Sequence, residues 1–364
     1  MTIKTKSTLE TIKPYVQGKS TLEGIAEPLK LSSNELPYPP SPAAIKAFHA
    51  VSACLGRYPD GAQTALRQAI AEIYGIDAGS IFASNGSEEA IGLVIRSVLS
   101  AGDNMVISEN SFLMAEIYAR SCGAEIRKAK ETDYRVDVDA LLALVDQNTR
   151  IMYVCSPNNP TGTFTPASEL ARLEAALPPG VLMIIDSAYA EFVTDPAYDC
   201  GIATLFKPQG RVVVTHTLSK AYGLAGIRIG WAAAPTDIID AVSRLRTPFN
   251  TNIAALSAAE AAIRDRGYLD AITGMINQTR EWFTEGLTAL GLSVVPSHTN
   301  FVLIVFPAGG SQACDLDATL QRAGILGRAV TGGANEFRIT IGTKEQMQQT
   351  LDVARQWVSS YSSY

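Results

Sequence analysis

The sequence is short of charge, has no excess of basic residues and contains no long apolar run. Charged residues make up 18% of the 364 residues, and the net charge is −6 at pH 7. Without a basic field we expect no attraction to nucleic acid or to an anionic membrane, so any anion must be bound locally. No run of about 18 apolar residues occurs, and the polar N-terminus lacks the apolar stretch of a signal peptide. We therefore expect a soluble, cytoplasmic protein.

Cysteine and histidine are also few, and they are scattered. The five cysteines stand singly, at Cys54, Cys122, Cys155, Cys200 and Cys314, and the three histidines at His49, His216 and His298. No pair has the close spacing of a zinc site, and isolated cysteines are typical of reduced thiols in a cytosolic protein. The sequence thus predicts neither a disulfide framework nor a metal site.

Hydrophobic residues make up 47% of the chain, enough for a sizeable core. Short apolar runs alternate with helical patterns, at 81–83, 104–107, 125–128, 151–155, 181–185 and 211–215. This alternation predicts an α/β fold with a mostly parallel sheet wrapped by helices. Further strands at 293–295, 300–306, 325–328 and 336–341, separated by single helices, indicate a smaller α+β domain. We expect an N-terminal arm over 1–40 that joins the small domain, a large domain over 41–279 and the small domain over 280–364.

The stretch T-H-T-L-S-K-A-Y-G-L-A-G-I-R-I-G-W, from Thr215 to Trp231, follows an apolar strand and places Lys220 just past the end of that strand. In open α/β sheets, ligands bind outside the carboxyl ends of the strands. Ser219 and Arg228 add a hydroxyl and a planar cation to the amine of Lys220. Together these groups can hold a phosphorylated aldehyde cofactor and bond to it as a Schiff base.

Other strand ends carry groups that such a pyridine cofactor needs. Asp186 can pair with a protonated ring nitrogen, and Asn159 and Tyr189 can donate to a phenolic oxygen. Phe112 can stack on the ring. Each residue has an ordinary structural alternative: Asp186 as a helix cap, Asn159 as a turn residue, Tyr189 as a boundary aromatic and Phe112 as core. Their succession in chain order at strand ends favours the cofactor site.

A second glycine-containing segment, S-N-G-S-E-E, follows the strand at 81–83 and predicts a helix start that binds phosphate. Gly86 permits a sharp turn, Ser87 is expected to cap the helix, and Glu88 lies in the first turn. We expect Gly86, Ser87 and Glu88 to bind the cofactor together with Ser219 and Arg228.

Nearly the whole chain resembles one enzyme family. The matching motifs are P-Y-x-x-G-K near Tyr15, L-S-S-N-E, R-Y-P-D-G, N-G-S-E-E, S-P-N-N-P-T-G, D-x-A-Y, the Lys220 segment, N-F-V-L and F-R-I-T-I-G-T. They are similar to those of fold-type-I aminotransferases that depend on pyridoxal 5′-phosphate, and most similar to the histidinol-phosphate aminotransferases of histidine biosynthesis. The resemblance implies an exchange of an amino group between histidinol phosphate, or a similar donor, and 2-oxoglutarate.

The resemblance also implies roles for individual residues. Lys220 would be the Schiff-base lysine and proton shuttle, with Asp186 and Tyr189 as its catalytic partners. Tyr58 would reach the phosphate of the neighbouring subunit, which makes a homodimer the functional unit. The substrate side would be formed by Tyr15, Asn34, Arg328 and Arg338, with Arg338 binding the carboxylate.

Four positions depart from the family pattern. N-E-L-P-Y-P places Leu36 and Pro39 where asparagine and glycine are usual, and His216 replaces the arginine of R-T-x-S-K; Phe112 also lacks the hydroxyl of a frequent tyrosine. These changes leave the cofactor site intact and bear on recognition of the distal part of the substrate. The resemblance also implies an alternative donor, the aromatic amino acid phenylalanine or tyrosine, since aromatic amino-acid aminotransferases arise within the same family. A decarboxylase would share the lysine site. A regulator with a non-catalytic cofactor-binding domain would need a DNA-binding domain, for which residues 1–40 are too short and irregular.

Overall fold

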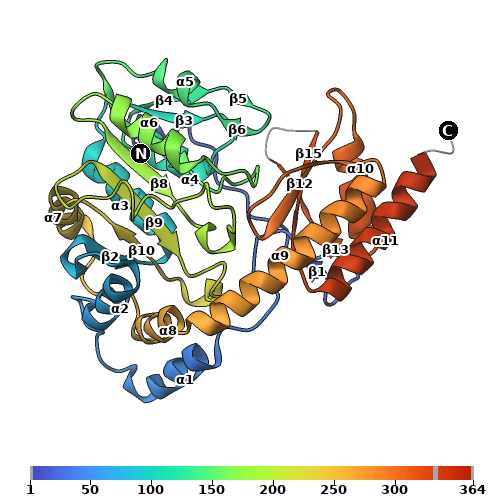
Figure 1. Ribbon diagram of the computed structural model, residues 1–364, viewed down its shortest axis with the longest axis horizontal. Coiled ribbons are helices and arrows are strands. Elements are labelled where there is room, and N and C mark those ends of the chain that lie inside the picture. The colour runs from blue at the N-terminus through green and yellow to red at the C-terminus, as the bar shows by residue number, and fades with distance from the viewer. Residues whose placement is uncertain (1–2, 331–334, 362–364) are drawn as a thin grey trace.

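The computed structural model describes residues 3–330 and 335–361. Its main sheet has the strand order β2 (Ile81–Ser84), β10 (Gly230–Ala233), β9 (Val212–Thr217), β8 (Leu182–Asp186), β7 (Thr149–Cys155), β3 (Asn104–Ser108) and β4 (Glu125–Ala129) (Figure 1). The neighbours from β9 to β4 pair in parallel, whereas β10 is antiparallel to both β2 and β9. The predicted α/β class with a mostly parallel sheet is confirmed.

Helices cover both faces of this sheet. One face packs against α3 (Gly86–Val98), α4 (Leu113–Ser121) and α7 (Thr236–Leu245). The other packs against α2 (Thr64–Tyr74), α5 (Val138–Leu142), α6 (Ala167–Ala176) and α8 (Ile253–Arg264), and α1 (Pro42–Ala50) lies on α8. Because successive side chains of a strand point to opposite faces, Ile184 joins the first core and Ile185 the second. Burial on both faces explains why these strands read as continuous apolar runs.

A long helix, α9 (Arg266–Ala289), leads from the main sheet to a second, antiparallel sheet (Figure 1). Its strand order is β11 (Ser293–Val295), β12 (Phe301–Val305), β15 (Glu336–Thr340) and β14 (Arg328–Ala329), and α10 (Gln312–Arg322) and α11 (Lys344–Tyr361) accompany it. The N-terminal arm joins this part of the molecule, because β1 (Leu29–Lys30) pairs in parallel with β13 (Ile325–Leu326). No helix of the described residues is long and apolar enough to cross a membrane.

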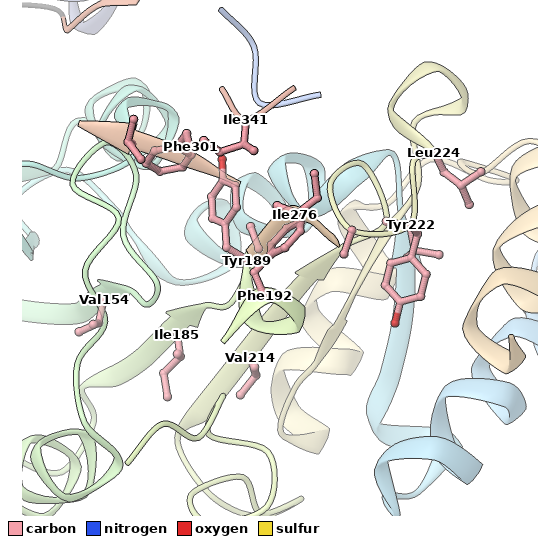
Figure 2. Close-up of a cluster of buried hydrophobic side chains, with 14 of the residues drawn as sticks. Val154, Ile185, Tyr189, Phe192, Val214, Tyr222, Leu224, Ile276, Phe301 and Ile341 are labelled. Carbon is pink, nitrogen blue, oxygen red and sulfur yellow. The ribbon is translucent and has the colours of Figure 1, made fainter. Parts of the chain in front are cut away.

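One apolar cluster links the two sheets. Figure 2 shows Tyr189 and Phe192, from the segment after β8, beside Phe301 of β12 and Ile276 of α9. The rings of Tyr189 and Phe301 meet edge to face, with their centroids 5.3 Å apart. Since these side chains belong to the same buried core, the segment that follows Asp186 is held between the two sheets.

Three local expectations differ from the structure. The helix after β2 begins at Gly86 with Asn85 as its N-cap, so Ser87 lies inside the first turn and does not cap the helix. The strand expected over 325–328 is split into β13 and β14 at Gly327, where a Cβ would collide with the ring of Phe337. A hairpin of β5 (Glu131–Thr132) and β6 (Arg135–Val136) was not predicted. Its turn places Asp133 and Tyr134 at positive φ without the Asn-Gly or Asp-Gly signature of such turns.

Candidate active site

The carboxyl ends of β7, β8 and β9 border a cavity of about 310 Å³. The loops that follow these strands supply one wall, and the N-terminal arm and β15 supply another. The predicted site residues that line it are Tyr15, Asn34, Ser87, Glu88, Phe112, Asn159, Asp186, Tyr189, Ser219, Lys220, Arg228, Arg328 and Arg338. Residues separated by more than 300 positions in the sequence therefore face one cavity.

Lys220 lies two residues beyond the last apolar position of the β9 segment, Leu218, and its side chain is partly open to the cavity. Its Nζ donates to the carbonyl of Ser33 at 3.1 Å. Burial lowers the pKa of this amine to about 7, and the nearby positive charge of Arg338 acts in the same direction. A substantial fraction of the amine is therefore neutral near pH 7, as a nucleophile requires.

Asp186 ends β8 and is buried at the floor of the cavity. Its Oδ2 accepts from the Tyr153 hydroxyl at 2.8 Å, and its Oδ1 accepts from Thr215 Oγ1 at 3.1 Å. Burial raises the pKa of this carboxyl group, and the two hydrogen bonds only partly oppose that effect. Within the described residues Asp186 forms no ion pair, so a buried acid faces the cavity without a contacting cation.

Tyr189 is tied to the arm. Its hydroxyl accepts from Asn34 Nδ2 at 2.8 Å. Asn34 has a positive φ of 55° and is itself fixed, because its backbone N–H donates to Thr340 Oγ1 and its carbonyl accepts from Asn300 Nδ2. The arm, β15 and the start of β12 thus jointly position the Tyr189 hydroxyl.

Arg338 of β15 lies buried beside Asn159. One of its terminal nitrogens donates to Asn159 Oδ1 at 2.5 Å and the other to the carbonyl of Ser32 at 3.0 Å. Burial lowers the pKa of the guanidinium to about 10, so the group stays charged at neutral pH. Its Nε is buried and has no hydrogen-bond partner among the described residues. A buried cationic donor with unused capacity is suited to an incoming carboxylate.

The start of α3 forms a candidate phosphate site. Gly86 has a φ of 80°, and a Cβ at this position would lie 2.7 Å from a terminal nitrogen of Arg228. Only glycine therefore lets Arg228 approach the first turn of the helix. Arg228 also donates to Ser219 Oγ at 3.3 Å. The N–H groups of the first turn, including those of Ser87 and Glu88, have no partner within the helix and favour an anion.

Arg328 of β14 contacts Tyr15 of the N-terminal arm. The guanidinium of Arg328 lies over the Tyr15 ring, 5.3 Å from its centroid, and donates to the carbonyl of Val16 at 2.9 Å. Phe112, directly before α4, lines this cavity and also an adjoining hollow of about 170 Å³. Arg328 lines both spaces as well, so the cavity continues past the Phe112 ring.

Tyr58 is the predicted cofactor-binding residue that lies away from this cavity. Its side chain is 81% exposed and stacks on Phe249 at 4.7 Å. Other large apolar side chains are exposed on the α1 side of the molecule, among them Phe48 and Leu55. Tyr58 is therefore not among the described residues that line the cavity of its own chain.

The sequence reasoning missed several groups around the cavity. Tyr153 and Thr215, which hold Asp186, were read only as strand residues, although their alternation along β7 and β9 places them on the face of Asp186. Cys155 and Thr217 line the cavity from the same strands. Ser32 offers only a carbonyl to Arg338, and no sequence signal announces such a backbone acceptor.

The donor set fits pyridoxal 5′-phosphate. An amine of lowered pKa, a buried carboxylate without a contacting cation and a helix start with Arg228 correspond to the aldehyde, the ring nitrogen and the phosphate of this cofactor. Asn159 and Tyr189 line the same cavity as Lys220 and Asp186 and can donate to the phenolic oxygen. Each part of the cofactor thus has a chemically matched partner in this chain.

Comparisons with known proteins agree with this geometry. A family model described as aminotransferase class I and II matches residues 26–353. Histidinol-phosphate aminotransferase of Maricaulis maris is 42% identical over 358 residues, covering 97% of this chain and 98% of the relative, and that of Rhodospirillum centenum is 42% identical over 349 residues, covering 95% and 96%.

Solved structures give the same result. The histidinol-phosphate aminotransferase of Sinorhizobium meliloti in complex with pyridoxal 5′-phosphate superposes with a TM-score of 0.88 at 25% identity and covers 99% of both chains. A Thermus thermophilus aspartate aminotransferase variant, at 20% identity and a TM-score of 0.83 over 98% and 100% of the chains, shares the fold. Site, sequence and fold agree: the chain belongs to the class I and II aminotransferases and is a transaminase that depends on pyridoxal 5′-phosphate.

Proposed function

We propose that this enzyme transfers an amino group between histidinol phosphate and 2-oxoglutarate, as the names of its 42% identical relatives suggest. The observation that carries the proposal is the pair of guanidinium groups, Arg338 and Arg328, in one cavity with Lys220. Glutamate carries two carboxylates, whereas histidinol phosphate carries a phosphate and no α-carboxylate. A site that serves both must accept anions of different shape.

The contacts of the residues support the following roles. Pyridoxal phosphate, when bound, supplies an aldehyde and an electron-withdrawing ring. Lys220 would be the residue that holds the cofactor through its aldehyde, and its neutral amine would be the base positioned to take the proton from the donor carbon. Asp186 holds a proton at the ring nitrogen, and Tyr153 and Thr215 keep the Asp186 carboxylate in place. Asn159 and Tyr189 orient the phenolic oxygen.

Two arginines divide the recognition of anions. Arg338 is buried, fixed by Asn159 and Ser32, and has a free Nε, so it suits a carboxylate in a defined position. Arg328 is more exposed and lies over the Tyr15 ring at the arm side of the cavity, so it suits the larger phosphate. Planar guanidinium groups bind both anions in bidentate fashion.

We further propose that the active unit is a cytoplasmic homodimer in which Tyr58 completes the phosphate site of the partner subunit. The support is its 81% exposure together with the exposed apolar side chains Ile45, Phe48 and Leu55 in the same part of the chain. We also propose that each subunit consists of an N-terminal arm over 1–40, a cofactor domain over 41–279 and a small domain over 280–364.

Steady-state kinetics with histidinol phosphate, phenylalanine and tyrosine as donors tests the substrate. We expect the highest kcat/KM for histidinol phosphate, with 2-oxoglutarate as acceptor. The apolar ring of Phe112 and the hollow behind it favour an aromatic amino acid as the second candidate. A preference for phenylalanine over histidinol phosphate would reject the first proposal and support the second. Release of carbon dioxide without an acceptor would instead indicate a decarboxylase.

A further inference from the structure

A buried pair of opposite charges lies on the face of the main sheet that points away from the cofactor cavity. His216 of β9 is 1% exposed, and its ring stacks on that of Trp231, its cross-strand partner in β10, with 4.5 Å between centroids. Its Nδ1 is 3.4 Å from Oε1 of Glu191, whose side chain is 6% exposed. Neither ring nitrogen and neither carboxylate oxygen has a well-aligned hydrogen bond within the described residues. The contact is therefore a close approach of an imidazole and a carboxylate in a buried site, 3.4 Å apart.

The surroundings decide the charge of His216. The titratable groups around the pair are Asp186 of β8, Tyr74 of α2, Tyr198 and Cys200 of the loop after β8, and Tyr222 of the lysine loop. Arg266, at the start of α9, acts in turn on Tyr74 and Tyr222. Burial alone would lower the pKa of the imidazole, but Cys200 and Glu191 outweigh burial and raise this pKa to about 9. At neutral pH the ring is an imidazolium.

The pair connects two segments that carry site residues. Glu191 lies two positions after Tyr189, in the short 3₁₀ turn η4 (Ala190–Phe192). His216 directly follows Thr215, which holds Asp186, and precedes Lys220 by four positions. Attraction between Glu191 and His216 therefore draws the Tyr189 segment against the strand that leads to the lysine.

We propose that His216 and Glu191 are positioning residues, which hold Tyr189, Asp186 and Lys220 in register from behind the sheet. Their role concerns the cofactor site and does not depend on which amino donor the enzyme prefers. In the family that the sequence resembles, arginine is usual at the position of His216. An arginine keeps its charge at any relevant pH, whereas the histidine of this chain loses it in alkali.

The sign of the pH effect follows from the raised pKa. A histidine whose pKa is higher in the folded than in the unfolded chain stabilises the fold fully below about 6.5, its ordinary value. That stabilisation is lost as the pH rises through about 9. We therefore expect His216 and Glu191 to hold the cofactor-site residues less firmly as the pH rises through about 9.

The test compares four variants of the full-length enzyme: Glu191→Gln, His216→Gln, His216→Arg and the control Tyr74→Phe, which removes a neighbouring hydroxyl but no charge. The dissociation constant of pyridoxal phosphate and kcat with a single donor are measured from pH 7 to pH 10, together with the thermal midpoint. Misplacement of catalytic groups by about 1 Å can cost on the order of a hundredfold in rate. At pH 7 we expect Glu191→Gln and His216→Gln to lose roughly tenfold to a hundredfold in kcat and to bind the cofactor more weakly.

His216→Arg gives the sharper result. We expect it to restore cofactor affinity and to remove the loss of affinity that we expect of the wild type between pH 8 and pH 10, while Tyr74→Phe keeps the wild-type pH profile. Glu191→Gln preserves side-chain volume, so it decides the question if the larger arginine does not fold. Wild-type cofactor affinity and kcat in a folded Glu191→Gln variant would overturn the proposal. A His216→Arg variant whose affinity declines with pH as the wild type does would overturn it too.

Discussion

At the scale of single residues, burial shifts the pKa values of two groups that line one cavity, and the two shifts have opposite directions. Burial lowers the pKa of the Lys220 amine to about 7 and raises that of the Asp186 carboxyl. Both shifts reflect the cost of keeping a charge away from water. A cofactor that bonds to the amine and brings a protonated ring nitrogen to the carboxylate would relieve both costs, so the pocket is electrostatically suited to it.

Replacing Lys220 tests the nucleophile. We expect Lys220→Ala to keep part of its affinity for pyridoxal phosphate, because the helix start, Arg228 and Asp186 remain, but to lose multiple turnover. Cofactor binding by equilibrium dialysis and product formation with histidinol phosphate measure the two effects separately. Near-native turnover without an added amine would contradict the assignment.

Tyr153→Phe tests the support of Asp186. The Tyr153 hydroxyl donates to Oδ2 at 2.8 Å, and hydrogen bonds to charged groups typically contribute about 1.5–3 kcal/mol. We expect a higher pKa for Asp186 and a kcat/KM lower by roughly one to two orders of magnitude. The control is Tyr268→Phe, which removes a hydroxyl bonded to the carbonyl of Pro39. Equal kinetics for the two variants would exclude the supporting role.

The two arginines should separate in their effects. We expect Arg338→Ala to lower kcat/KM strongly for glutamate and 2-oxoglutarate. We expect Arg328→Ala to lower kcat/KM more for a phosphorylated donor than for an unphosphorylated aromatic one. Each lost charge-assisted bond should cost about one to two decades in kcat/KM. Kinetics with histidinol phosphate, phenylalanine and glutamate on both variants measure this, and identical losses for all three donors would reject the division of roles.

At the scale of elements, strand ends were predictable from sequence and their partners were not. Apolar runs located β7, β8 and β9, and parallel pairing then implied that Asn159, Asp186 and Lys220 share an edge. The antiparallel insertion of β10 between β2 and β9 has no such signal, because a four-residue apolar run looks the same in either direction. Nor does the sequence show that Asn34 donates to Tyr189, since that contact depends on how the arm folds back.

The arm offers a prediction at this scale. Residues before β1 carry Tyr15 and Val16, which contact Arg328, but they supply none of the groups at Lys220, Asp186 or the start of α3. Deleting residues 1–20 should therefore raise KM for a phosphorylated donor and leave the affinity for pyridoxal phosphate unchanged. Donor kinetics and cofactor titration on the truncated enzyme check both parts. A matching loss of cofactor affinity would show that the arm also supports the cofactor site.

At the scale of the whole molecule, the site is proposed to need two chains. Lys220→Ala and Tyr58→Phe chains, each weakened alone, should regain activity when mixed, because one site of the mixed dimer then has both native groups. The measurement is activity after joint refolding, with each variant refolded alone as the control. Full activity of Tyr58→Phe by itself, or no recovery in the mixture, would reject the shared site.

The pairing of β1 with β13 has a consequence for the order in which the site is completed during synthesis. Every strand of the main sheet lies between residues 81 and 233, so Asp186, Lys220 and the start of α3 can assemble while the ribosome is still translating the last third of the chain. The pairing of Leu29 with Ile325 and the hydrogen bond from Asn34 to Thr340 can form only after the C-terminal part of the chain has been made. We therefore expect the part that carries Asp186 and Lys220 to form first, and the part that carries Asn34 to close only when the two ends of the chain meet.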